Sequence, residues 1–159
     1  MTNSRDEQFM RQAILWARRG IRQGQTPFGA CIVKDGRVVS RAHNRVWKKT
    51  DITAHAEIEA IRRACKKLKT VRLTGCVIYS TCEPCPMCFS ACHWADIAKI
   101  VYGADINDAR KAGFRELSIS SRWMRRKGRS RTAVVPGCLR QDNRGLFSEW
   151  RRRRNRRAY

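Results

Sequence analysis

The sequence has few acidic residues and no long apolar run. Only 13 of its 159 residues are Asp or Glu, against 35 Lys or Arg, so the formal net charge is +22. No apolar stretch approaches the ~20 residues that a membrane-spanning helix requires, which excludes a spanning segment and argues against a membrane partner. The first ten residues are polar and of mixed charge, unlike a secretory signal peptide. These absences predict a cytoplasmic protein.

Internal repeats are absent as well, and the length suits a single domain. With 42% hydrophobic residues, the chain can build a core. The positive charge is concentrated towards the C-terminus, where residues 110–159 hold 17 Lys or Arg and three acids. We expect one folded domain over residues 1–142 and a basic C-terminal helix or tail over residues 143–159. The charge favours a polyanionic partner such as nucleic acid, and a highly charged solvated surface is the alternative.

Helical and strand patterns alternate along the chain. Helices are predicted over residues 6–19, 54–68, 86–95 and 143–157, strands over 76–80 and 99–104, and a hairpin over 27–33 and 37–42. Residues 118–131 give no clear pattern and are predicted to form a loop. This order is typical of the α/β class, as a three-layer α/β/α sandwich with a mixed central sheet.

The ends of some elements carry local signals. Ser4 and Glu7 fit a capping box at the start of the first helix, and Gly20 fits its end. Asp35 and Gly36 supply a two-residue hairpin turn.

Eight cysteines without a secretion signal indicate thiols or metal ligands rather than disulfides. Four of them, Cys31, Cys65, Cys76 and Cys92, are most simply explained as small buried apolar side chains. The cysteines from Cys82 to Cys92 are much more closely spaced than the others, and this group is the candidate for a metal site.

Two predicted helices begin with side chains that bind metal ions. His55 opens one helix, and Cys85 and Cys88 open the other, one turn apart, so both thiolates can reach one ion. One histidine and two cysteines suit zinc, and three protein ligands leave the fourth tetrahedral position to water, as in catalytic zinc sites. Helix N-termini also favour the thiolate form. Because each helix follows a strand, both N-termini are expected at one edge of the sheet.

Glu57 lies two residues after His55, about 200° around the helix at ~3.6 residues per turn, and need not bind the same ion. A carboxylate there can take up and return a proton of a zinc-activated water. Taken alone, Cys-x-x-Cys also fits a redox pair or half of a structural zinc site, and adding Cys82 would close the site with a fourth ligand. Together, His-x-Glu and Pro-Cys-x-x-Cys form the signature of zinc nucleobase deaminases. We therefore expect Zn2+ on His55, Cys85 and Cys88, with Glu57 catalytic.

Further segments spread along the chain match one family pattern. They are Thr26-Pro-Phe-Gly-Ala30, Thr53-Ala-His-Ala-Glu57, Ser80-Thr-Cys-Glu-Pro-Cys-Pro-Met-Cys88, Trp94-Ala95, Asp108-Ala-Arg-Lys-Ala-Gly-Phe114 and Tyr159. On these segments the sequence resembles the cytidine deaminase-like superfamily over nearly its whole length. Within that superfamily it is similar to the bacterial guanine deaminases and the plant guanosine deaminases. The tRNA adenosine deaminases share the Glu-Pro-Cys-Pro-Met-Cys segment.

The resemblance implies a cytidine deaminase-like fold, a homodimer and a set of substrate-binding residues. These residues are Phe28, Asn44, Ala56, Trp94, Glu116 and Tyr159. Asn44 would hydrogen-bond the base, because an amide offers both a donor and an acceptor. Phe28 and Trp94 would enclose a purine, and Glu116 would accept bonds from the N1–H and amino group of guanine. The C-terminal segment would cross to the partner subunit, where Tyr159 caps the neighbour's pocket. Ordinary core aromatics and a surface carboxylate are the alternatives for Phe28, Trp94 and Glu116.

Three functions are consistent with these features. The first is zinc-dependent hydrolytic deamination of a free purine base or nucleoside, foremost guanine to xanthine and ammonia. The second is deamination of adenosine or cytidine in tRNA or single-stranded DNA, with Trp123 and the basic residues of 122–131 as strand contacts. The third is a zinc-stabilised basic binding module without turnover, which the presence of Glu57 disfavours. We expect the first.

Overall fold

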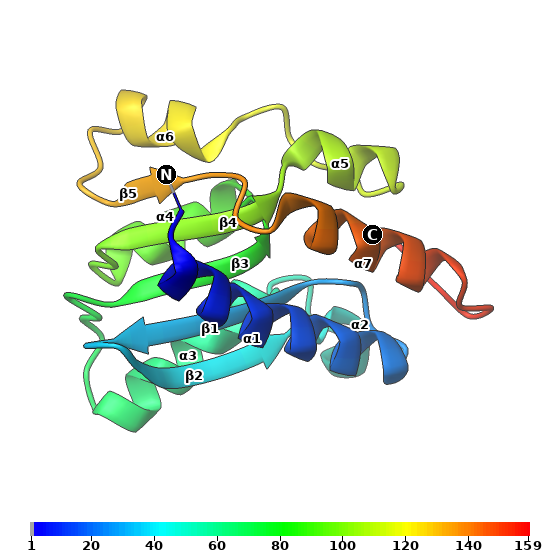
Figure 1. Cartoon of the computed structure of the whole chain (residues 1–159), viewed down its shortest axis with the longest axis horizontal. Helices are drawn as coiled ribbons and strands as arrows, with labels where there is room; N and C mark the ends of the chain where they lie inside the picture. Colours follow the sequence, from blue (N-terminus) through cyan, green and yellow to red (C-terminus); the bar gives the residue numbers. More distant parts are fainter. Residues whose placement is uncertain (1) are drawn as a thin grey trace.

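The computed structural model describes residues 2–159. A five-stranded sheet forms the centre of the fold (Figure 1). In chain order the elements are α1 (Ser4–Arg22), β1 (Gly29–Lys34), β2 (Arg37–His43), α2 (Val46–Lys49), α3 (Ala56–Leu68), β3 (Val77–Cys82), α4 (Pro86–Trp94), β4 (Lys99–Ala104), α5 (Ile106–Lys111), α6 (Ser121–Lys127), β5 (Ala133–Val135) and α7 (Arg140–Arg151). The strand order is β2-β1-β3-β4-β5. Strand β1 is antiparallel to β2 and β3, whereas β3, β4 and β5 are parallel. The predicted mixed sheet is confirmed.

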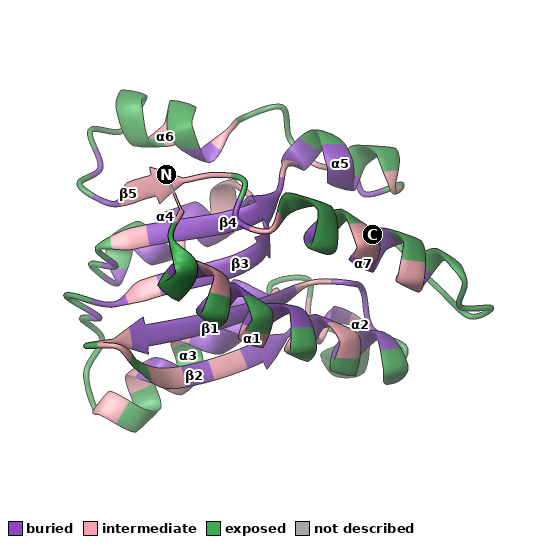
Figure 2. Cartoon of the chain, in the orientation of Figure 1, coloured by how far each residue is buried: buried purple, intermediate pink, exposed green. Residues whose placement is uncertain are grey.

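Helices cover both faces of this sheet, and each face has its own apolar core (Figure 2). On one face α1 packs against β1, where Cys31 and Val33 belong to the core, and α7 packs against β4 and α1. On the other face α3 and α4 pack against a layer that includes Ala30 and Ile32. Because successive side chains of a strand point to opposite faces, a continuous apolar run fills both cores. No helix within residues 2–159 combines the length and the apolar character that crossing a membrane requires.

The β1–β2 hairpin closes as predicted and positions one edge of the site. Asp35 and Gly36 have φ values of 48° and 73°, as a type I′ turn needs. At the far end of the hairpin, the backbone N–H of Asn44 donates to the carbonyl of Phe28 at 3.0 Å. The hairpin therefore places these two residues side by side.

The first helix differs from the prediction at both ends. Its cap is Asn3, whose side chain accepts from the backbone N–H of Asp6 at 2.8 Å, and Asp6 completes the capping box. Gly20 does not end the helix, which continues to Arg22. A Cβ at Gly20 would lie 3.0 Å from the His43 side chain, so this glycine serves the close crossing of α1 over β2.

The C-terminal third is more ordered than predicted. Residues 118–131, predicted to form a loop, contain α6. Ser120 caps this helix, since its side chain accepts a hydrogen bond from the backbone N–H of Trp123 at 3.1 Å. The last helix runs over Arg140–Arg151 instead of 143–157. Helix α7 stops where the arginine run begins, since like charges one turn apart destabilise a helix. The sequence patterns also missed the short elements α2, α5 and β5.

Two glycines give a paired prediction on stability. A Cβ at Gly29 would meet the Ala13 carbonyl oxygen at 2.2 Å and the Ala17 nitrogen at 2.6 Å, both of them backbone atoms of α1. Gly29→Ala is therefore expected to lower the free energy of unfolding by about 1–3 kcal/mol. Gly145 lies inside α7 with open space around its Cα, so Gly145→Ala is expected to raise it by up to ~1 kcal/mol. Urea titration measures both, and equal midpoints for the two variants would contradict the packing argument.

Candidate active site

Three metal-binding side chains meet where α3 and α4 begin. The Nδ1 atom of His55 lies 3.7 Å from the Sγ of Cys85 and 3.6 Å from the Sγ of Cys88. All three ligand atoms lie within 4.8 Å of one another. Zinc–nitrogen bonds of about 2.0–2.1 Å and zinc–sulfur bonds of about 2.3 Å in tetrahedral geometry put neighbouring ligand atoms about 3.5–3.8 Å apart. The observed spacing therefore fits one tetrahedral zinc ion, and the predicted ligands are confirmed.

Local structure explains why these side chains face one another. His55 is the N-cap of α3 and Cys85 the N-cap of α4, and neither side chain makes a capping hydrogen bond to its own helix. Both are thus free to bind a metal. Pro86 occupies the first helical position, where its missing N–H does no harm, and Cys88 follows in the first turn. The positive ends of both helix dipoles point at the ligand group, which favours thiolates there.

The protonation of the ligand group follows from its burial and its charges. A hydrogen bond from Cys88, together with one hydrogen bond and the positive charge of His55, outweighs burial and lowers the pKa of Cys85 to about 4. Burial raises the pKa of Cys88, and its hydrogen bond to Cys85 adds to the increase. Burial lowers the pKa of His55, but the hydrogen bond with Cys85 and the negative charges of Glu57, Cys85 and Glu116 together outweigh burial, and the net shift is upward. Without metal, Cys85 is thus the thiolate, and zinc must displace protons from its neighbours.

Glu57 lies directly beside the ligand group but outside it. Its Oε2 atom is 3.5 Å from the Sγ of Cys88, and its Oε1 accepts from the hydroxyl of Ser80 at 2.8 Å. The side chain is 6% exposed, and this burial raises its pKa, opposed in part by the nearby His55. A buried carboxylate beside an open metal position is arranged for proton transfer. Its catalytic role stays a prediction.

A cavity of about 380 Å³ opens in front of the ligand group, within the range of small-molecule sites. Its walls are mostly apolar, formed by Ile52, Met87, Phe114 and Leu117 together with Tyr159 and Glu116. Glu116 also lines a small inner space that reaches Glu57. Burial, and after it the negative charge of Cys85, raise the pKa of Glu116 to about 7. The structure therefore places Glu116 in the site and not on the open surface.

Asn44 meets the C-terminal residue. Its amide nitrogen donates to the hydroxyl of Tyr159, and its oxygen accepts from the backbone N–H of Val46 at 3.0 Å. The Tyr159 ring lies 5.4 Å from the ring of His55. Further back in the tail, the Arg157 carbonyl accepts from the indole N–H of Trp47 at 3.0 Å. Within this chain the tail thus returns to its own site, while a homodimer with exchange of residues 143–159 stays a prediction.

The other predicted substrate residues lie at different depths. Phe28 lines the inner space with Glu57 and packs edge-on against Phe114, with ring centroids 4.8 Å apart. Ala56 is fully buried at the first position of α3. Trp94 is 82% exposed at the end of α4, beside His93. Trp94 does not line either cavity in front of the metal ligands.

Sequence patterns missed two residues that support the site. Ser80, which donates a hydrogen bond to Glu57, is a polar residue beside Thr81 at the end of β3, and its place at the start of the Ser80–Cys88 segment is the signal that could have identified it. Glu83 is buried beside Cys82 and accepts from the backbone N–H of Ser121 at 2.8 Å. Cys82 itself lies outside the metal-ligand group, with its Sγ 3.6 Å from the carbonyl of Asp105.

Comparisons with known proteins agree with this site. Residues 3–104 match the family described as the cytidine and deoxycytidylate deaminase zinc-binding region. A guanine deaminase of Bacillus subtilis is 38% identical over 154 residues, which are 96% of this chain and 98% of that protein. A tRNA-specific adenosine deaminase of Aquifex aeolicus is 45% identical over 98 residues, 62% of this chain and 65% of that protein. A solved guanine deaminase from Nitrosomonas europaea has a TM-score of 0.85 at 28% identity, covering 94% of this chain and 85% of that one.

Proposed function

The chain belongs to the cytidine and deoxycytidylate deaminase zinc-binding family, and from this premise we propose that it hydrolyses free guanine to xanthine and ammonia. At the coarser level it is a zinc-dependent deaminase acting on a purine base or on adenosine in tRNA. The choice of guanine rests on one observation, the partly buried carboxylate of Glu116 in the wall of the cavity that His55 and Cys85 also line. A carboxylate there can accept both the N1–H and the amino group of guanine. Similarity to guanine deaminases over nearly the whole chain supports this choice.

The chain's own residues have separate tasks in this reaction. Zinc on His55, Cys85 and Cys88 supplies the Lewis acidity that activates water at neutral pH. Glu57 takes one proton from the attacking water and delivers it to the ring nitrogen, and then carries water's second proton to the amino group, which leaves as ammonia while water's oxygen becomes the carbonyl of the product. Ser80 orients Glu57 by donating to its Oε1. A purine that fills the cavity displaces water from its apolar walls, which strengthens every polar contact made there.

The alternative is deamination of adenosine in tRNA. Its support is the similarity to a tRNA-specific adenosine deaminase and the formal charge of +22, which suits a phosphate backbone. The cavity wall favours guanine over adenine, since adenine presents an amino donor and a bare N1 acceptor, and the ionised carboxylate of Glu116 has no proton to donate to that acceptor.

The deciding experiment measures ammonia release by zinc-loaded protein from guanine, guanosine, cytosine, cytidine, adenine, adenosine and a tRNA anticodon stem-loop. We expect turnover of guanine. Glu116→Gln is expected to lower that turnover by about 10- to 100-fold, because a hydrogen bond to a charged group is replaced by a mismatched amide. Ammonia from the stem-loop adenosine alone would contradict the proposal and establish the alternative.

A further inference from the structure

A second hollow of about 770 Å³ lies on α6 and β5. It is lined chiefly by Arg122, Trp123, Arg125, Arg126, Arg129 and Val134. None of these residues lines the two cavities in front of the metal ligands. We call this surface the α6 groove.

The α6 groove carries positive charge that no ion pair neutralises. Arg122, Arg125 and Arg126 follow the i, i+3, i+4 spacing and so lie on one side of α6. No acidic residue occurs between residues 117 and 141. Within the part of the chain that the structure describes, no ion pair involves an arginine of the groove. Four unpaired guanidinium groups around one hollow favour an anionic ligand from outside.

The same groove contains an aromatic ring. Trp123 lines it and is 47% exposed. An exposed tryptophan among arginines combines a stacking surface for bases with charges for phosphates, which is the usual composition of single-strand binding grooves. Arginine guanidinium planes can also stack on bases. A small inorganic anion could pair with the arginines but would not stack on the Trp123 ring.

The groove is held rigidly at both ends. At the start of α6, the Ser121 hydroxyl donates to the carbonyl of Pro84 at 3.0 Å, beside the bond from its backbone N–H to Glu83. After the helix, the Ser130 hydroxyl pairs with Nδ1 of His93 on α4 at 3.0 Å. A surface that is already ordered loses little conformational entropy when it binds a ligand.

We propose that the α6 groove binds single-stranded nucleic acid, with phosphates on its arginines and a base stacked on Trp123. This binding site is separate from the zinc cavity. The proposal does not depend on which purine the zinc site deaminates.

The test is fluorescence anisotropy with a short labelled oligothymidylate. Thymine has no exocyclic amino group, so this probe cannot be a deaminase substrate and reports binding alone. The groove variant combines Arg125→Gln, Arg126→Gln and Arg129→Gln. We expect it to bind at least about tenfold more weakly. The slope of log affinity against log salt is expected to fall by about 2, at ~0.7 for each phosphate that is no longer neutralised.

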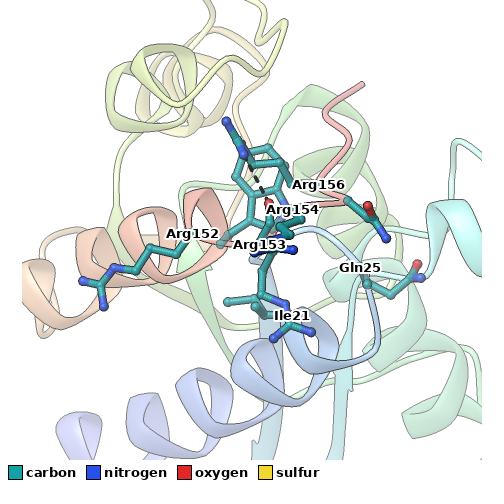
Figure 3. A pocket seen from close by; sticks show the side chains of 9 residues that line it. Ile21, Gln25, Arg152, Arg153, Arg154 and Arg156 are labelled. Carbon is teal, nitrogen blue, oxygen red and sulfur yellow. Dashed lines mark hydrogen bonds between the residues drawn. The ribbon is translucent and has the colours of Figure 1, made fainter.

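A matched control removes the same charge from another basic surface. Arg152, Arg153, Arg154 and Arg156 line a separate hollow of about 390 Å³ beside Ile21 and Gln25 (Figure 3). The control variant combines Arg152→Gln, Arg153→Gln and Arg154→Gln, and is expected to retain most of the affinity. Equal reductions in the two variants, or unchanged binding by the groove variant, would overturn the proposal.

The stacking role of Trp123 has its own readout. Trp123→Leu is expected to weaken binding at least about fivefold, whereas Trp123→Phe keeps an aromatic face and most of the affinity. Melting temperature and guanine turnover are expected to stay at wild-type values in both. Binding of phosphatidylserine vesicles that the oligothymidylate fails to displace would assign the groove to a membrane surface and overturn the proposal.

Discussion

Glu57→Gln is expected to lower the turnover number for purine deamination by about 10²- to 10⁴-fold, the usual contribution of a positioned general acid–base group. Glutamine has the same shape, and its amide oxygen can still accept the hydrogen bond from the Ser80 hydroxyl. Glutamine cannot take a proton from water, so the fall in turnover number measures the contribution of proton transfer by Glu57. Ammonia release by zinc-loaded protein measures it, and zinc content is expected to be unchanged because Glu57 is not among the three metal ligands.

Glu59 offers a matched control on the same helix. It is buried like Glu57, but its carboxylate pairs with Arg45, Lys49 and Arg62 and lies outside both cavities. Glu59→Gln is expected to reduce stability while leaving ammonia release intact. If Glu57→Gln were as active as Glu59→Gln, the proton-transfer role would have to be assigned to another group.

Cys85→Ala is expected to abolish both stoichiometric zinc binding and deamination. Replacing even a residue that only orients a metal ligand typically weakens metal binding about 10- to 100-fold, and the loss of one of three direct ligands exceeds that. Cys85 is also the thiolate of the metal-free site, with its pKa lowered to about 4 by the hydrogen bond from Cys88 and then by the hydrogen bond and positive charge of His55. Plasma mass spectrometry of the dialysed protein gives the zinc content directly.

Cys82→Ala is the control that separates an open zinc site from a closed one. Cys82 lies near the site and lines the inner space, but it is not part of the three-ligand group. We expect this variant to keep its zinc and its activity. A fall in zinc content as large as that of Cys85→Ala would mean that Cys82 is a fourth ligand, which would leave no position for water.

Local spacing was enough to identify the metal ligands. Cys85 and Cys88 are one helical turn apart in the sequence, so any helix beginning at Pro86 brings their thiols together. The proximity of His55 followed from a rule about sheet edges, and the 3.7 Å separation from Cys85 agrees with it. Element boundaries were less predictable where a tertiary contact overrode a local signal, as at Gly20, which lies against His43.

The substrate side of the site depends on contacts between distant segments. Asn44 and Tyr159 are 115 positions apart and hydrogen-bonded, and only one of the two predicted enclosing aromatics, Phe28, lies within the cavity walls. No periodicity in the sequence encodes such pairings, because they arise when segments far apart in the chain, here the residue after β2 and the tail after α7, meet in the folded structure.

Patterns along the chain were sufficient for the α/β class, the three zinc ligands and Glu57 as the candidate proton carrier. These features depend on helical and strand periods and on residues within one turn of each other, which the backbone geometry makes predictable. The folded arrangement was needed to show that Glu116 lies partly buried in the cavity wall, that Trp94 is on the surface, and that the arginines of α6 surround Trp123 in one hollow. Burial and convergence of side chains are properties of packing between elements, and packing is absent from any local pattern.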